Sequence, residues 1–326
     1  MRNSRRPIVI VSRGSHLARR QAHIIGDALG RRAPHVDVEY RWVETEGDRA
    51  IDVPLSSVSG KGLFVRKIER VLLTGQADIA VHSLKDLPAR ETTQGLTIAA
   101  IGVRANARDC LIGRNGEKSV EELPPGATVG TSSPRRAAQL LRWRSDLNIQ
   151  FMRGNVETRL RKVREEAECD ATILALAGLH RSGLHDHGAV ALDPDVMLPA
   201  AGQGALAVQC RADDHVTIRR CLPINEPITA AATHAERSVV AGLEADCHSA
   251  IGALAEPIGD RGVEGFRLRV RVLTPDGSQC IDTDDRLIPK TLHKMLKQIV
   301  IDLVKRGAPS LLETVPADLK KSTQAI

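Results

Sequence analysis

An aspartate that follows a short apolar segment is the first candidate for chemistry in this sequence. Residues 81–88 have the sequence VHSLKDLP, which places Lys85 and Asp86 directly after a run that is typical of a buried strand. Ligands of α/β proteins bind where such strands end. An ionised carboxylate at that position can stabilise a developing positive charge or transfer a proton. The alternative is that Lys85 and Asp86 form a local ion pair in a turn.

Three expected junctions between a strand and a helix combine serine or glycine with basic side chains. They lie at residues 12–15, 59–62 and 130–136, and they carry Arg13, Lys61, Arg135 and Arg136. The unpaired N–H groups and the dipole at a helix N-terminus attract anions, and arginine binds carboxylates with two parallel hydrogen bonds. Together with the loop at 152–155 and the following Arg159, these junctions predict an arginine-lined, anion-binding cleft. The alternative is ordinary helix capping with exposed basic side chains.

Several other motifs have simpler explanations. The lysine of residues 59–62 is followed by glycine rather than serine or threonine, so this segment is not a phosphate-binding P-loop. The glycines at 202–207 follow a Leu-Pro segment rather than a strand, which argues against a dinucleotide-binding fingerprint. His180, His185 and His187 lie in a short turn with a single carboxylate, where we expect a solvated loop and no metal site. The six cysteines are scattered without a CxxC pair, which argues against a zinc ribbon.

Strand and helix patterns alternate through the first two-thirds of the chain. Expected strands lie at 7–12, 37–43, 77–83, 96–103, 109–113, 127–131, 148–152 and 171–177, and expected helices at 17–29, 63–73, 134–143 and 156–166. Ser133 and Pro134 suit the N-cap and the first position of one helix. This alternation predicts an α/β fold of parallel sheets covered by helices. From about residue 229, a helix at 233–244, a strand at 266–273, a hairpin turn at 275–277 and a helix at 289–305 predict a smaller α+β domain.

Composition narrows the possible functions. The chain has 326 residues and a formal net charge of +6, and it lacks an apolar segment near the ~20 residues of a membrane span. The basic N-terminus is not followed by the apolar core of a signal peptide, so we expect a cytoplasmic protein without a membrane partner. Aromatic residues make up only 2% of the chain, so surfaces that stack on nucleic acid are scarce. A non-catalytic protein that holds an anion between two lobes is the main rival to an enzyme.

Seven segments, taken together and in this order, carry a resemblance to a known family. They are RGSHLARRQA, SGKGLFVRKIE, ADIAVHSLKDLP, VGTSSPRR, RGNVETRL, LALAGLHR and LPAAGQGAL. From about residue 7 to 310 the chain resembles the porphobilinogen deaminases, which are also called hydroxymethylbilane synthases.

The resemblance implies a transferase of tetrapyrrole and haem biosynthesis. Members of this family join four porphobilinogen molecules head to tail, release ammonia each time and form hydroxymethylbilane. The chain grows on a dipyrromethane cofactor that is attached to a cysteine through a thioether. The implied fold has two domains similar to periplasmic binding proteins and a smaller α+β domain with the cysteine. We predict a monomer with domain 1 at 1–104 and 204–223, domain 2 at 105–203 and domain 3 at 224–326.

The resemblance also implies roles for individual residues. Asp86 and Lys85 are the implied catalytic residues, with Asp86 against the cationic intermediate that follows the loss of ammonia. The implied cofactor-binding residues are Cys247, Arg13, Lys61, Ser83, Thr131, Ser132, Ser133, Arg135, Arg136, Arg153 and Gly154. The implied substrate-binding residues are Gln21, Arg159, Arg181, Gln203 and Phe64, with a place in the hydrophobic core as the alternative for Phe64.

The segment around Cys247 departs from the family pattern. The family has two glycines before the cysteine and a proline three residues after it, where this chain has Ala245, Asp246 and Ala250. Alanine adopts the left-handed conformations of glycine poorly, and a neighbouring carboxylate raises the pKa of a thiol. Two hypotheses follow: dipyrromethane is attached at Cys247, or the chain is a diverged member that binds an anionic ligand without loading the cofactor.

Overall fold

The part of the chain that the structure, a computed structural model, describes forms two compact units. The described residues are 6–32, 36–44, 65–90, 93–184, 188–246, 248–259, 262 and 264–313. One unit comprises Met1–Asn106, Ala177–Leu184 and Gly204–Ala231, and the other comprises Ala107–Leu176, His185–Gln203 and Ala232–Ile326. Within the described ranges, no helix is long and apolar enough to cross a membrane.

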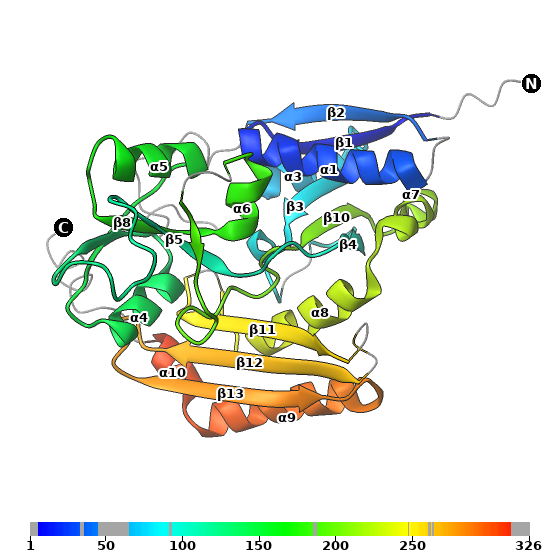
Figure 1. The fold of residues 1–326 in the computed structure, drawn as a ribbon. Helices are drawn as coiled ribbons and strands as arrows, with labels where there is room; N and C mark the ends of the chain where they lie inside the picture. The colour runs from blue at the N-terminus through cyan, green and yellow to red at the C-terminus, as the bar shows by residue number, and fades with distance from the viewer. Residues whose placement is uncertain are drawn as a thin grey trace, which may run out of the picture. The chain divides into compact units, whose positions relative to one another are not determined.

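The first unit is built on a five-stranded mixed sheet (Figure 1). Its strands are β1 (Ile8–Arg13), β2 (Val38–Val43), β3 (Ile79–Ser83), β4 (Leu96–Ile101) and β10 (Leu206–Arg211). Their order is β2-β1-β3-β10-β4, with β1 parallel to β2 and β3 and with β10 antiparallel to both of its neighbours. The pairing of β10 with β3 aligns Leu206 with Ser83, so the return strand supports the end of β3.

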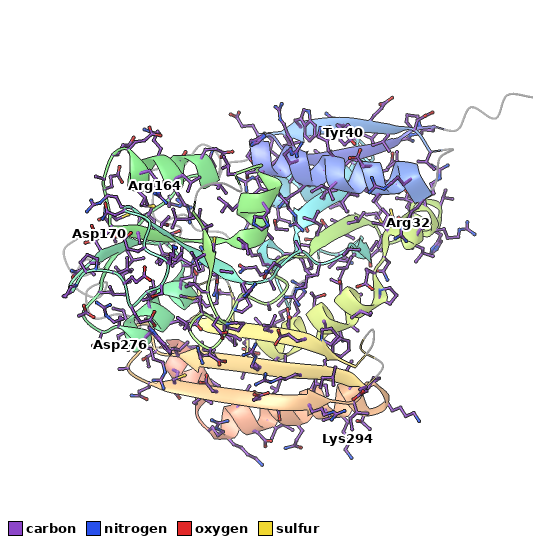
Figure 2. All side chains as sticks on the ribbon, viewed as in Figure 1. Arg32, Tyr40, Arg164, Asp170, Asp276 and Lys294 are labelled. Carbon is purple, nitrogen blue, oxygen red and sulfur yellow. The ribbon has the colours of Figure 1, made fainter. Side chains whose placement is uncertain are left out.

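Helices cover both faces of this sheet. Side chains alternate along β1, so Ile8 and Ile10 pack against α1 (His16–Arg32), whereas Val9 and Val11 pack against α3 (Arg66–Leu73). Burial on both faces explains why β1 is apolar at nearly every position. On α1, Gly26 leaves room for the hydroxyl of Tyr40 from β2, because a Cβ at position 26 would lie 2.0 Å from that oxygen (Figure 2).

A second five-stranded sheet lies in the other unit. Its strands are β5 (Asp109–Gly113), β6 (Thr128–Gly130), β7 (Asn148–Gln150), β8 (Ala171–Ala175) and β9 (Val190–Ala191), in the order β7-β6-β8-β5-β9. The helices of this unit that follow its strands are α4 (Pro134–Trp143) and α5 (Val156–Arg164), whereas α6 (Leu176–Arg181), which follows β8 in the chain, belongs to the first unit from Ala177 onward. Leu111, Val129 and Ile173 form its core with Leu140 of α4.

A three-stranded antiparallel sheet completes the second unit. It consists of β11 (Ile251–Ile258), β12 (Gly265–Leu273) and β13 (Cys280–Leu287), and the nearby helices are α8 (Pro227–Gly242), α9 (Leu292–Lys305) and α10 (Ala308–Glu313). On β12, Leu268 and Val270 are buried, whereas the alternate residues Arg267, Arg269 and Arg271 form ion pairs. The alternation separates an apolar face, which packs on helices, from a charged face.

The α/β fold class is confirmed, with the smaller α+β part at the end of the chain. The expected strand at 109–113 and the expected helix at 134–143 coincide with β5 and α4. The expectation of parallel sheets is wrong in part, since β10 and β5 pair antiparallel with their neighbours. A buried apolar run carries no information about strand direction, which depends on how the chain returns to the sheet. The helix expected to begin at residue 233 begins at Pro227.

Candidate active site

Asp86 lies on a short turn that the apolar residues around it hold in place. β3 ends at Ser83 and continues into a 3-10 turn at Leu84–Asp86. Leu84 and Leu87 are buried in a cluster with Ala205 and Ala207, and the Leu84 N–H donates to the Ala205 carbonyl at 3.0 Å. Asp86 stands between these two anchors and is exposed. The sequence LKDL therefore fixes the turn through its leucines and presents the carboxylate to solvent.

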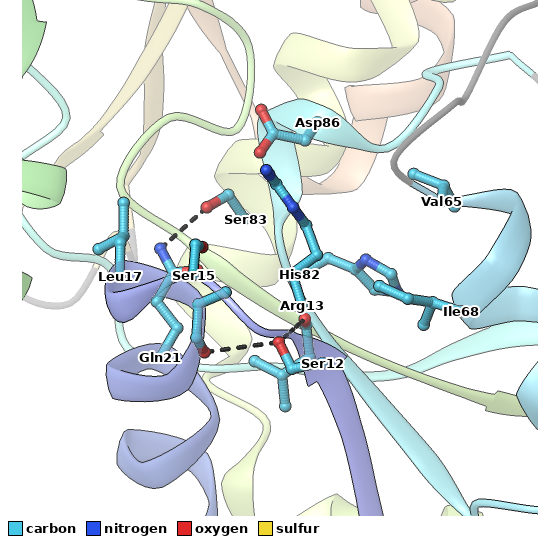
Figure 3. Close-up of a pocket in the computed structure, with 12 residues that line it drawn as sticks. Ser12, Arg13, Ser15, Leu17, Gln21, Val65, Ile68, His82, Ser83 and Asp86 are labelled. Carbon is cyan, nitrogen blue, oxygen red and sulfur yellow. Dashed lines mark hydrogen bonds between the residues drawn. The ribbon is translucent and has the colours of Figure 1, made fainter. Parts of the chain in front are cut away.

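A pocket in the first unit brings several of the predicted site residues together (Figure 3). It is lined by Ser12, Arg13, Ser15, Leu17, Ala18, Gln21, Val65, Ile68, Val81, His82, Ser83 and Asp86. The Gln21 Nε2 group donates to the Ser83 hydroxyl at 2.9 Å, and the Arg13 side chain is directed toward the Asp86 carboxylate (Figure 3). The pocket thus collects Arg13 and Gln21 from one stretch of the sequence and Ser83 and Asp86 from another. Lys85 is half-buried and is not one of the lining residues.

The second unit contains the helix start with two arginines. Ser133 is the N-cap of α4 and accepts from the Arg136 N–H, and Pro134 occupies the first turn, as the sequence predicts. Thr131 is buried, and its hydroxyl accepts from the Ser133 N–H at 3.2 Å. Ser132 is half-buried between them. These contacts fix the backbone immediately before Arg135 and Arg136.

A buried aspartate holds both of these arginines. Asp109 has no exposed surface, and its two oxygens lie 2.8 Å from the guanidinium groups of Arg135 and Arg136. The Gln203 amide donates to the same carboxylate at 2.9 Å. The guanidinium of Arg135 also donates to the Leu198 carbonyl at 2.7 Å. Removing a charged partner from such a group is strongly destabilising, so the cluster orients the arginines firmly.

Asp109 is not among the site residues predicted from the sequence, which indicates only a strand at 109–113 with Asp109 as its first residue. A carboxylate at the start of an otherwise apolar, buried strand needs a cation or several N–H donors, because an unpaired buried charge is unstable. That signal was present in the sequence, but the spacing did not show which of the many arginines supply the cation.

Two further arginines extend this positive cluster. The pKa of Arg159 is lowered to about 10, mainly by burial and to a lesser extent by the charges of Arg136 and Arg153. Arg159 is still charged at neutral pH. The Arg159 Nε group donates to the Gly154 carbonyl at 3.0 Å. Gly154 has a φ of +123°, and a Cβ there would lie 2.7 Å from the Thr158 side chain, so this position requires glycine. Arginines with mutually repelling charges are typical of a site for an anion with several carboxylates.

Arg181 and Gln203 are held by contacts inside their own units. The Arg181 Nη2 group donates to the Gly204 carbonyl at 2.7 Å, and burial lowers the pKa of Arg181 to about 10. Gln203 is 1% exposed and donates to the Ala107 carbonyl as well as to Asp109. The loop before Gln203 is anchored by the buried Glu236, which accepts from the Gly202 N–H at 2.7 Å.

Several predictions lie outside the described residues. They concern Lys61, Phe64, Cys247, and the turn with His185, Asp186 and His187. Next to position 247, Asp246 accepts from the His248 N–H at 2.8 Å and from the Ser249 hydroxyl at 3.3 Å. The described non-glycine residues with positive φ are Ala167 and Glu244. Ala245 and Asp246 therefore adopt ordinary backbone conformations, and the expected strain from the missing glycines is absent at these two positions.

The other five cysteines are poorly suited to react. Burial is the main reason that the pKa is raised to about 12 for Cys110 and Cys221, and to about 11 for Cys210 and Cys280. Burial also raises the pKa of Cys169. Since the thiolate is the nucleophile, these thiols are unreactive near neutral pH.

Comparison with known proteins identifies the family. Residues 8–219 match the family model described as "Porphobilinogen deaminase, dipyromethane cofactor binding domain". The chain belongs to the porphobilinogen deaminase family. A porphobilinogen deaminase from Syntrophobacter fumaroxidans is 41% identical over 311 residues, which cover 95% of this chain and 98% of that protein. The predicted family, activity and dipyrromethane cofactor are thereby confirmed.

Solved structures give only weak likenesses. YhfZ from Shigella flexneri is 19% identical, with a TM-score of 0.35 over 74% of this chain and 99% of that one. A sulfonate-binding protein, SsuA from Methylobacillus flagellatus, is 12% identical, with a TM-score of 0.38 over 72% of this chain and 68% of that one. Such scores say nothing about ligands, and the fold class of this deaminase follows from its own sheets.

Proposed function

We propose that Asp86 carries the chemistry of the porphobilinogen deaminase reaction in this chain. The observation that carries this proposal is an exposed carboxylate on a rigid turn, at the rim of a pocket with one arginine and several hydroxyl and amide groups. Loss of ammonia from porphobilinogen leaves a positive charge on the pyrrole. A fixed carboxylate stabilises that charge and can accept a proton from the ring that attacks.

The neighbours of Asp86 are proposed to bind and orient the substrate. Porphobilinogen carries acetate and propionate groups, and Arg13 is the side chain in the pocket that can pair with a carboxylate. The Gln21 amide donates to the Ser83 hydroxyl and thereby fixes the direction in which that hydroxyl donates. Lys85 is proposed to assist from the same turn, and Phe64 and Lys61 are proposed to line the site.

The arginine cluster of the second unit is proposed to hold the carboxylates of the dipyrromethane and of the growing chain. Arg135, Arg136, Arg153 and Arg159 supply more positive charge than Asp109 balances, and this excess fits a ligand with several carboxylates. When bound, the cofactor supplies the terminal pyrrole to which the substrate is joined. Thr131, Ser132, Ser133 and Gly154 shape the backbone around these arginines, and Arg181 and Gln203 are proposed to bind the later rings.

Cys247 is proposed as the anchor of the cofactor. In support, the pKa values of the other five cysteines are raised, mainly by burial. Asp246 uses its carboxylate within the loop, where it caps the His248 N–H, so its charge is partly satisfied by the backbone. Asp246 is not among the described residues with a positive φ, so this position does not require a glycine.

The intact mass of the purified protein tests the anchor. We expect an added mass equal to two linked pyrrole units in the wild-type protein and none in a Cys247→Ala variant. Added mass in both proteins would place the anchor on another residue. An unmodified mass in both would support the second candidate, a diverged member that binds an anionic ligand without loading the cofactor.

We further propose that the protein is a cytoplasmic monomer with three domains, at residues 1–104 with 204–223, 105–203, and 224–326. The separate three-stranded sheet at the end of the chain supports the third domain. Analytical ultracentrifugation checks the oligomeric state, since a single species of 35.3 kDa is expected. A concentration-dependent species of twice that mass would contradict the monomer.

A further inference from the structure

A hydrogen-bonded network of buried polar side chains begins at His82, one of the residues that line the Asp86 pocket. His82 on β3 lines the pocket, and its Nε2 atom lies 3.1 Å from Oε1 of Gln209 on β10. The Nε2 group of Gln209 donates to Glu69 on α3 at 2.9 Å, and the Thr93 hydroxyl donates to the other oxygen of Glu69 at 2.7 Å. His82, Gln209 and Glu69 are each at most 9% exposed. Polar groups buried to this degree need a complete set of hydrogen bonds.

The direction of these hydrogen bonds follows from their chemistry. An ionised carboxylate only accepts, so Glu69 receives the Thr93 hydroxyl and the amino end of the Gln209 amide. The carbonyl end of Gln209 is then the end that faces His82, and a carbonyl also only accepts. The ring must therefore donate from Nε2. In an uncharged imidazole this leaves Nδ1 without a proton. The hydrogen bonds through Gln209 therefore select one of the two tautomers of His82.

The surroundings of the ring also favour its uncharged form. Burial lowers the pKa of His82, although Glu69, the hydrogen bond to Gln209 and the charge of Asp86 act in the opposite direction. The charged groups near the ring are Glu69 from α3, Asp86 from the turn after β3 and Arg13 from the end of β1. Gln209 stands between the ring and Glu69 and contacts both, so the acid forms no ion pair with the imidazole.

We propose that His82 is a positioning residue of the deaminase reaction, which Glu69 and Gln209 hold as the uncharged Nε2–H tautomer so that this wall of the pocket stays neutral. An imidazolium there would compete with the cationic form of the substrate for the Asp86 carboxylate, since like charges in a partly desolvated pocket repel. This inference rests on the proposed role of Asp86. It assigns a task to His82, Gln209 and Glu69, none of which contacts Asp86 through a hydrogen bond among the described residues.

Nitrogen NMR of the histidine rings in the cofactor-loaded, full-length protein tests the tautomer directly. The His82 signals, identified by their absence in a His82→Gln variant, should show a proton on Nε2 and none on Nδ1 near neutral pH. A Gln209→Leu variant should show both tautomers, because the acceptor that selects one of them is gone. Protons on both nitrogens of wild-type His82 at neutral pH, or an Nδ1–H form, would overturn the proposal.

Kinetics of matched variants test the functional part. His82→Gln keeps an uncharged donor toward Gln209 and should retain kcat within about threefold, whereas His82→Lys places a positive charge on this wall and should lower kcat by about tenfold or more. KM should change little, because Arg13 binds the carboxylates of the substrate. Equal losses in both variants, at equal melting temperature, would contradict the proposal.

A variant of Thr93, the member of this hydrogen-bond network that is farthest from His82, serves as a control. Thr93→Val removes one donor to Glu69 but leaves the Gln209 contact, so the His82 tautomer and kcat should both be unchanged. Failure of the proposed role of Asp86 can be told apart from failure of the proposal on His82. An active Asp86→Asn variant would refute the role of Asp86, whereas the tautomer signals of His82 would not be affected. A change in tautomer in Thr93→Val would instead show that the ring responds to general loosening of the fold.

Discussion

Asp86 and Asp109 are two aspartates that follow or begin short buried strands, yet the fold treats them in opposite ways. Asp86 is exposed at the rim of a pocket, with the side chain of Arg13 directed toward it (Figure 3). Asp109 is fully buried and is held by Arg135, Arg136 and Gln203. A fully buried carboxylate that is paired with two arginines is closed off from a ligand. The comparison therefore supports the proposed chemical role of Asp86 and a structural role for Asp109.

The arginines differ in the same way. Arg135 and Arg136 are each at most 6% exposed, form ion pairs with Asp109 and donate to backbone carbonyls, so their orientation is set before any ligand arrives. Arg13 is half-buried at the end of a strand, and its charge faces the pocket. Preorganised cations suit a cofactor that stays bound, whereas a more accessible cation suits a substrate that enters and leaves.

The largest expected effect is on activity, from Asp86→Asn. The amide keeps the shape but loses the charge, so the rate of porphobilinogen consumption should fall by about 10²- to 10⁴-fold, the usual contribution of a positioned acid or base. The melting temperature should be unchanged because the side chain is exposed. A variant with near-normal rate would remove Asp86 from the chemistry.

For Asp109→Asn the large effect is expected on stability, in contrast to Asp86→Asn. Two buried arginines would lose their counter-charge, and the free energy of unfolding should drop by about 3–5 kcal/mol, as for other buried pairs that lose one partner. Urea denaturation beside the Asp86→Asn protein measures the difference. A drop below about 1 kcal/mol would mean that the arginines relax toward solvent and are not held by Asp109.

Glu236→Gln sharpens the comparison with a third carboxylate. Glu236 is fully buried and accepts from the Gly202 and Ala255 backbone N–H groups at 2.7 and 2.8 Å. Glutamine offers one acceptor in place of two, so one N–H faces an amino group, and the free energy of unfolding should fall by about 1–3 kcal/mol. Glu264→Gln, at an exposed ion pair of β13, is the matched control and should change it by less than about 1 kcal/mol.

The smallest expected effect is on the pH dependence of stability. The pKa of His82 is lowered in the folded protein, so below pH ~6.5 the unfolded chain takes up a proton that the folded protein does not. Stability should therefore fall as the pH drops below that value, by at most about 1.4 kcal/mol per pH unit from this residue. His82→Gln lacks this proton uptake, so its unfolding curves at pH 5 and pH 7 should lie closer together than those of the wild type. An unchanged separation would show that His82 is protonated in the folded state.

Local signals in the sequence predicted much of the fold. The Ser133-Pro134 start of α4 and the apolar strand of β5 were predicted at their observed positions because capping and burial are encoded within a few residues. β10, β11 and β13 were not predicted. The ladder of β13, with Asp282 and Asp284 facing arginines on β12, has little apolar character of its own, and its pairing partner defines it as a strand.

For the site, the sequence by itself determined the family, the activity and the turn that presents Asp86, because the motifs around Arg13, Asp86 and Arg135 are contiguous runs with specific residue types. Only the tertiary structure decided that Gln21 bonds to Ser83, that Asp109 holds Arg135 and Arg136, and that Gln209 links His82 to Glu69. These partners are 26 to 140 positions apart along the chain. Such contacts depend on how strands and helices pack, and no spacing within a motif records that packing.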